Sequence, residues 1–219
     1  MKKYFFMQPV LKFIGEGTLF SRIFASALRV FAVLFSIGAL IGWIQLWKVV
    51  FDMSGAAILG GFLFQVFFVI GVYMVVHTLW IRAADIQAIG KSEFTIIPIV
   101  SIFLRMLGEI YACIALAVGV GGGVLQLFAG YSGLADRATR SIPGIGLSQS
   151  LLSGLFGGDG ASSFVSALLL MVGGAIGAVF WLVLFYLASE FIVVVVSIAR
   201  NTHALREMVE RHIQSGQNP

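Results

Sequence analysis

Four charged side chains lie well inside otherwise apolar stretches of this 219-residue chain, and they are the residues best placed to carry chemistry. They are Arg29, Arg105, Glu109 and Glu190. Inside a membrane such groups mark proton relays, ion pathways or polar pockets, because an isolated charge in the hydrocarbon costs at least about 2.5 kcal/mol. The same cost favours a purely structural arrangement, in which opposite charges pair away from lipid.

The spacing of these charges favours the structural interpretation. Arg105 and Glu109 are four residues apart, so they share one face of a helix and are able to pair within it. Glu190 and Arg29 would complete a network between helices, with Arg29 reaching toward the headgroups. At 1.5 Å per residue along a helix, all four lie at a similar depth, in the half of their apolar segments that the charge distribution described below assigns to the cytoplasmic side. We therefore predict a salt-bridge network that holds the helices in register, and an ion relay is the alternative.

The elements that must position these residues are four apolar segments. Each is longer than the roughly 20 residues that cross a bilayer as a helix. Hydrophobic residues make up 59% of the chain and charged residues 11%, whereas about a quarter of the residues of a soluble domain are charged. We predict an all-α membrane protein whose four transmembrane helices form two hairpins, at residues 23–50, 56–81, 96–128 and 164–198.

The remaining segments divide the chain into three parts. Aromatic residues beside lysines predict an interfacial N-terminal segment. The transmembrane part is expected to be a four-helix bundle with a long outer loop, and leucines at helical spacing predict an amphipathic helix in that loop. The boundaries are 1–22 for the interfacial segment, 23–198 for the bundle, 129–163 for the outer loop and 147–156 for its helix, and 199–219 for a cytoplasmic helical tail.

The tail carries its own pattern. Ile198, Leu205, Val209 and His212 fall near a heptad stripe, which is typical of helices that pack on another helix. A solvated extension of the last span is the simpler interpretation, and a docking helix for another subunit is the more specific one.

Basic residues are distributed unevenly between the two sides of the predicted membrane. Eleven of the 14 lysines and arginines fall on the side of the N-terminus. Because cytoplasmic flanks carry this excess, both termini are expected in the cytoplasm, at the cell inner membrane. The same residues would attract anionic lipids of the inner leaflet, by about 1 kcal/mol for each basic residue near the surface. No nucleic-acid partner is implied.

Glycines recur four residues apart in three of the spans. Such steps let helix backbones approach closely where lipid offers no hydrophobic drive for association. Glycine is also common in membrane helices in general, and the chain has 26 of them, so chance matches are the alternative. The candidate helix-packing residues are Gly38 and Gly42, Gly119 and Gly123, and Gly173 and Gly177.

Motifs of enzymes, metal sites and cofactor sites are missing from the sequence. Cys113 is the single cysteine, and the three histidines, His77, His203 and His212, are scattered, so neither zinc spacing nor a disulfide occurs. The glycine-rich stretch at residues 119–123 lacks the Lys-Ser/Thr ending of a phosphate loop. We therefore expect no catalytic activity, no metal and no cofactor.

One stretch resembles a known group of proteins. Phe-Tyr-Leu-Ala-Ser-Glu at residues 185–190, then an aliphatic run, then Ser-Ile-Ala-Arg-Asn at residues 197–201 is similar to the second helix of a family of uncharacterised small bacterial membrane proteins. The resemblance covers residues 185–201 and implies a bacterial inner membrane.

Together these observations predict a non-catalytic integral membrane subunit or scaffold. It would pack against other integral membrane subunits or copies of itself, through its glycine faces and amphipathic segments. The alternative is a small transporter or a proton- or ion-conducting component that uses Glu109 or Glu190.

Overall fold

The computed structural model describes residues 18–89, 96–130 and 163–216. Within these ranges the chain is helical and contains no strand. The helices are α2 (Thr18–Phe51), α3 (Ala56–Ala88), α4 (Ile96–Ala129) and α7 (Ser163–Gly216). All four are long and apolar enough to cross a membrane, which confirms the expected class. The predicted helix at 147–156 and most of segment 1–22 lie outside the described residues.

Two helix ends have clear local causes. The turn between α2 and α3 contains Gly55 with φ 61°, a left-handed conformation that glycine adopts without a Cβ penalty. α3 continues to Ala88 rather than ending near residue 81, because Arg82 and the following Ala-Ala-Asp-Ile-Gln-Ala include strong helix formers. Arg82 is consequently a helix residue, although the sequence suggested a connecting segment.

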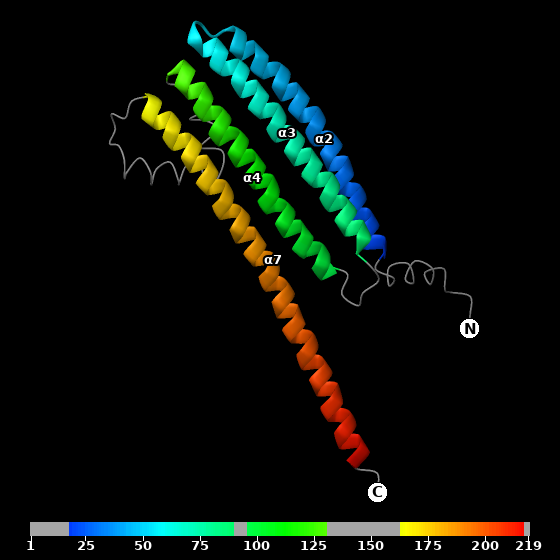
Figure 1. The fold of residues 1–219 in the computed structure, drawn as a ribbon. Helices are drawn as coiled ribbons and strands as arrows, with labels where there is room; N and C mark the ends of the chain where they lie inside the picture. The colour runs from blue at the N-terminus through cyan, green and yellow to red at the C-terminus, as the bar shows by residue number, and fades with distance from the viewer. Residues whose placement is uncertain (1–17, 90–95, 131–162, 217–219) are drawn as a thin grey trace, which may run out of the picture.

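The helices follow one another in a row. α2 packs on α3, α3 on α4, and α4 on α7. α2 and α7 therefore lie at the two ends of the row (Figure 1). The sequence predicts a four-helix bundle without fixing its shape, and in the structure the four described helices form an open row. The outer faces carry large aliphatic residues, and in lipid there is no hydrophobic drive to bring such faces together.

The exposed faces are consistent with lipid contact. Val30, Leu34 and Ile41 of α2 are each more than half exposed, as are Val179 and Val183 of α7. A soluble protein rarely exposes apolar surface on this scale. The helix faces that do not contact a neighbour therefore suit the acyl chains of a bilayer.

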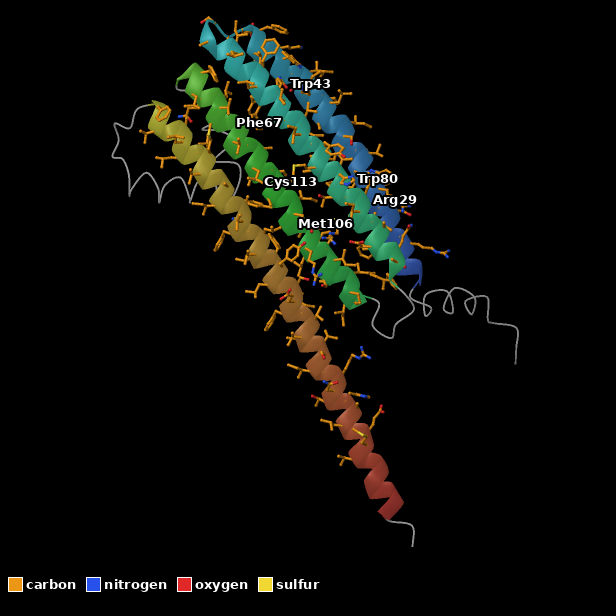
Figure 2. All side chains as sticks on the ribbon, viewed as in Figure 1. Arg29, Trp43, Phe67, Trp80, Met106 and Cys113 are labelled. Carbon is orange, nitrogen blue, oxygen red and sulfur yellow. The ribbon has the colours of Figure 1, made fainter. Side chains whose placement is uncertain are left out.

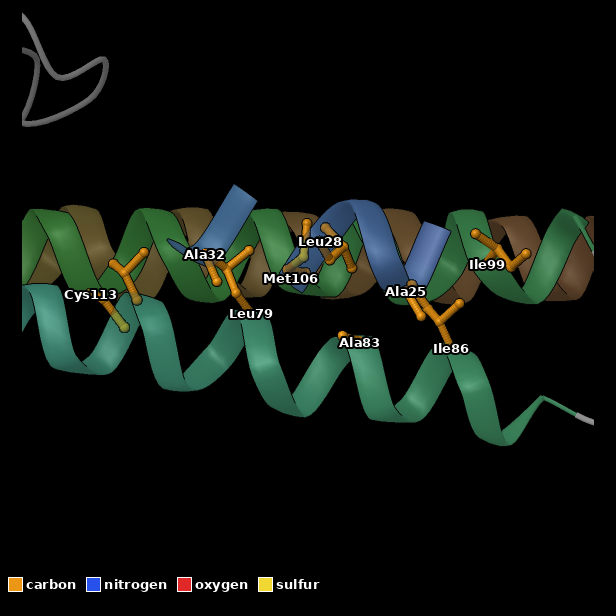
Figure 3. Close-up of a cluster of buried hydrophobic side chains, with 10 residues drawn as sticks. Ala25, Leu28, Ala32, Leu79, Ala83, Ile86, Ile99, Met106 and Cys113 are labelled. Atoms are coloured by element: carbon orange, nitrogen blue, oxygen red, sulfur yellow. The ribbon is translucent and has the colours of Figure 1, made fainter. Parts of the chain in front are cut away.

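A cluster of buried residues joins the first three helices near the start of α2 and the end of α3. Leu79 and Ala83 of α3 lie against Ala25 and Ala32 of α2, and Met106 of α4 belongs to the same cluster (Figure 3). All except Met106 have no exposed surface, and Met106 has 3%. The small alanine side chains let the helix backbones come close, which maximises van der Waals contact.

α7 extends far beyond the other helices. Its first part runs beside α4, and its last part projects from the end of the row, away from the other described helices (Figures 1 and 2). The 54-residue helix is about 80 Å long at 1.5 Å per residue. The helical character expected for residues 199–219 is therefore present up to Gly216, while the cytoplasmic position of this part stays a prediction.

Candidate functional site

The most polar site lies between α3, α4 and α7 and is centred on Glu109. Arg82 Nε donates a hydrogen bond of 2.8 Å to Glu109 Oε2, and a terminal nitrogen of the same guanidinium bonds to Glu109 Oε1. This contact is bidentate: two nitrogens of the planar guanidinium bond to the two oxygens of one carboxylate. It joins α3 to α4 with a geometry that lysine would not reproduce.

Two further residues complete this site, which we call the Glu109 cluster: Arg82, Asp85, Glu109 and Tyr186. The Tyr186 hydroxyl of α7 donates to Glu109 Oε1 at 2.5 Å and accepts from Arg82 at 3.3 Å. Asp85, one turn after Arg82, forms an ion pair of 2.7 Å with the remaining terminal nitrogen. The cluster therefore connects three helices through one guanidinium.

Arg105 lies next to this cluster but bonds to α7 rather than to Glu109. Its Nε donates to Ser189 Oγ at 3.0 Å, and its guanidinium carbon lies 5.6 Å from the centre of the Tyr186 ring. Ser189 is fully buried and is also 2.7 Å from Ser101 Oγ. With Arg105 included, two positive and two negative side chains are gathered at this level, so the local charge is balanced.

The predicted network of four charges is thus divided among three places. Glu109 and Arg105 are neighbours around Tyr186, but the ion pair of Glu109 is with Arg82. Arg29 lies on α2, where it bonds to Gln87. Glu190 lies on the exposed surface of α7 and has no hydrogen bond or ion pair with the described residues. Ser189, one residue earlier and about 100° around the helix, occupies the buried position instead.

Three site residues, Arg82, Tyr186 and Ser189, were not predicted from the sequence. Arg82 was missed because the second span was expected to end at residue 81. The available signal was the spacing Arg82–Asp85, which places opposite charges three residues apart on one helical face. Tyr186 carries no comparable signal, since a tyrosine among apolar residues is typical of many membrane helices.

The predicted glycine positions fall into two groups. A Cβ at Gly119 would lie 2.7 Å from Gly174 Cα and 3.3 Å from the Leu170 carbonyl oxygen, so this is a close contact between α4 and α7. Gly123 lies equally close to Met171 on the same side. Gly173 and Gly177 are buried. Gly38 has no atom within 4 Å of a Cβ placed there, and for Gly42 the nearest is a Phe68 ring carbon at 4.0 Å. The α2 glycines therefore do not provide a tight helix contact.

Several close glycine contacts lie outside the predicted four-residue steps. They are Gly60 and Gly61 at the turn end of α3, Gly71 in its middle, Gly108 against Phe185, and Gly121 against Phe67. The spacing from Gly60 to Gly71, and from Gly108 to Gly121, does not follow a four-residue repeat. The four-residue repeat therefore does not predict these contacts.

Metal-binding residues do not gather in the part of the chain that the structure describes. No three of its histidine, cysteine, aspartate and glutamate side chains come together. His77 is exposed and stacks on Tyr73, with ring centres 5.6 Å apart. Cys113 is buried among the apolar residues of the cluster shared by α2, α3 and α4.

The Glu109 cluster is suited to bracing helices. Its donors and acceptors bond to one another across α3, α4 and α7, and the side chains of Arg82 and Glu109 are only 19% and 20% exposed. Such a paired set offsets the cost of placing charge within an apolar segment. The fold and this cluster define the class: a multi-pass α-helical membrane protein braced by a polar cluster between helices. Comparison with family models, curated proteins and solved structures yields no match to this chain.

Proposed function

We propose that this protein is a non-catalytic membrane subunit that packs against other membrane proteins or a second copy of itself. The observation that carries this proposal is an exposed apolar stripe on α7 that the other described helices leave uncovered. On this proposal the protein lies in a bacterial inner membrane with both termini in the cytoplasm, as the excess of basic residues on that side and the resemblance of residues 185–201 suggest.

The α7 stripe consists of five exposed apolar residues: Phe191, Val195, Ile198, Leu205 and Val209. Their separations of four, three, seven and four residues follow a heptad pattern on one continuous helix. Residues with this spacing form the seam between packed helices. The stripe begins just after Ser189, where α7 makes its last described hydrogen bonds to α4.

The second half of the stripe supports a protein partner rather than lipid alone. Arg200, Asn201, Thr202 and His203 follow Ile198 and are all exposed, so the helix becomes polar there. Leu205 and Val209 are nevertheless 59% and 57% exposed. Beyond the acyl chains, apolar side chains in a row are stabilised when another apolar surface covers them. A partner helix that follows α7 out of the membrane would do so.

Substitution of the stripe tests this proposal. We expect Leu205→Gln combined with Val209→Gln to weaken association at least tenfold, because each removes an apolar contact from an interface in which a few residues contribute most of the affinity. The measurement is the mass of the complex purified in mild detergent. Ala204→Gln is the matched control, since Ala204 is exposed on the same helix but off the stripe. If the wild-type chain is purified only as a lone monomer, the proposal is wrong.

A small proton- or ion-conducting component is the second candidate. One observation favours it: Glu109 is a carboxylate within an apolar span, bonded to a phenol that could pass a proton and 20% exposed. Intramembrane acids with such partners occur in proton relays. The mutual bonds of the Glu109 cluster, and the balance of charge at this level once Arg105 is counted, favour the scaffold.

Flux measurements distinguish the two candidates. In proteoliposomes we expect Glu109→Gln and the wild type to show the same proton and cation flux, equal to that of protein-free vesicles. Glu190→Gln is the control, because Glu190 is exposed and outside the cluster. A wild-type flux that Glu109→Gln abolishes in a folded protein, and that Glu190→Gln leaves intact, would replace the scaffold with the conducting component.

A further inference from the structure

Arg29 is held in a defined position at the edge between α2 and α3. One terminal nitrogen donates to Gln87 Oε1 at 2.7 Å, and the guanidinium carbon lies 5.7 Å from the centre of the Trp80 ring. Arg29 and Trp80 are neighbours near the end of the row where α2 begins (Figure 2). Snorkelling alone does not fix an arginine in this way, whereas these two contacts orient its planar group.

The charge of Arg29 is not neutralised by the described residues. None of the ion pairs among them includes Arg29, and its partners Gln87 and Trp80 are uncharged. The nearest turns of α3 supply Asp85, but this carboxylate bonds to Arg82. A guanidinium with N–H groups to spare at this position is therefore available to an external anion.

A second arginine lies on the same face of α2. Arg22 precedes Arg29 by seven residues, two helical turns or about 10 Å along the axis. It is exposed and forms no ion pair within the described residues. Two positive groups thus line one edge of the molecule.

Next to Arg29 the surface becomes apolar. On α3, Trp80 is 47% exposed, and further along the same helix Tyr73, Val69 and Val66 are 65%, 50% and 56% exposed. The same face also carries exposed His77, which stacks on Tyr73. A cationic pair that leads into this largely apolar face matches the two parts of a phospholipid, the headgroup and the acyl chains. A free phosphate would use only the first part. Basic pockets between transmembrane helices are known to bind anionic headgroups.

We infer that Arg22, Arg29, Trp80 and Gln87 form a binding site for one anionic phospholipid. The guanidinium groups of Arg29 and Arg22 bind the phosphate and the anionic headgroup. Trp80 lies at the level of the glycerol, and the acyl chains lie along α3 from Tyr73 toward Val66. The site is on α2 and α3, so it is independent of the α7 stripe and of the proposed partner.

Lipid retention tests this site. The full chain is purified in mild detergent, supplied with equal amounts of phosphatidylglycerol and phosphatidylcholine, and examined by native mass spectrometry. We expect the wild type to retain phosphatidylglycerol preferentially. Arg29→Gln and Arg22→Gln are each expected to lower that retention roughly fivefold, the effect of one basic residue at an anionic surface. Arg22 is exposed, so its substitution leaves the packing of the helices unchanged.

Controls separate this site from general surface charge. Lys48→Gln removes an exposed basic residue at the other end of α2, and it is expected to leave retention unchanged. Added inorganic phosphate is expected not to displace the lipid. The inference is overturned if Arg29→Gln and Arg22→Gln retain as much phosphatidylglycerol as the wild type, if Lys48→Gln lowers retention equally, or if inorganic phosphate competes.

Discussion

Gly119→Val is expected to force α4 and α7 apart. We expect it to lower the free energy of unfolding by about 3 kcal/mol, which is the upper end of the usual cost of overpacking. A Cβ there would lie 2.7 Å from Gly174 Cα and 3.3 Å from the Leu170 carbonyl oxygen. Both are backbone atoms, so no rotamer change relieves the overlap. Thermal unfolding in detergent, followed by circular dichroism, measures the loss.

The chain offers a matched control for this substitution. Gly38→Val introduces the same side chain into the middle of α2, where no atom lies within 4 Å of the new Cβ. We expect its effect to stay within about 0.5 kcal/mol. Gly174→Val should reproduce the loss from the other side, because a Cβ there lies 2.6 Å from Gly119 Cα. If Gly38→Val and Gly119→Val proved equally stable, α4 and α7 would not meet at Gly119 and Gly174.

Removing the guanidinium of the Glu109 cluster is expected to be equally costly. Arg82→Met leaves the carboxylates of Glu109 and Asp85 without the cation that joins them. Breaking a buried ion pair by removing one partner costs about 3–5 kcal/mol. The Arg82 and Glu109 side chains are 19% and 20% exposed, so we expect a value at the lower end, about 3 kcal/mol, in the same unfolding measurement.

A double-mutant cycle identifies the origin of that loss. Adding Glu109→Leu to Arg82→Met removes the unpaired carboxylate, and we expect the double variant to recover part of the lost stability, since apolar replacement of a whole ion pair is often nearly neutral. Glu190→Gln serves as the control for changing an acidic residue within the apolar segments, and it should have little effect. If the two substitutions in the cluster were simply additive, the Arg82–Glu109 contact would not be the source of the stability.

The two sites brace the row of helices at different depths. Gly119 and Glu109 are ten residues apart on α4, about 15 Å along its axis. α4 therefore contacts α7 closely through glycine at one level and through Tyr186 and Ser189 at another. These contacts leave the opposite face of α7 exposed with respect to the other described helices, and that face leads into the α7 stripe.

Hydropathy along the chain determined where the helices cross the apolar layer. Segments predicted at 23–50, 56–81, 96–128 and 164–198 correspond to α2, α3, α4 and α7, because the transfer of a segment into lipid depends on its own composition and length. The positions of the charges along these segments also follow directly from the sequence. Gly119 and Gly123 were also identified, since backbone contact between membrane helices requires small residues.

Only the tertiary structure decided which of these residues meet. Pairing depends on the rotation and the vertical offset of each helix relative to its neighbours, and neither is a property of one segment. A rotation of about 100° separates buried Ser189 from exposed Glu190. The continuation of α3 past residue 81 makes Arg82 a helix residue, and it is Arg82 rather than Arg105 that pairs with Glu109. Gly38 meets nothing and Gly119 meets Gly174, although both belong to the same four-residue pattern, because the pattern records spacing and not the direction of the neighbouring helix.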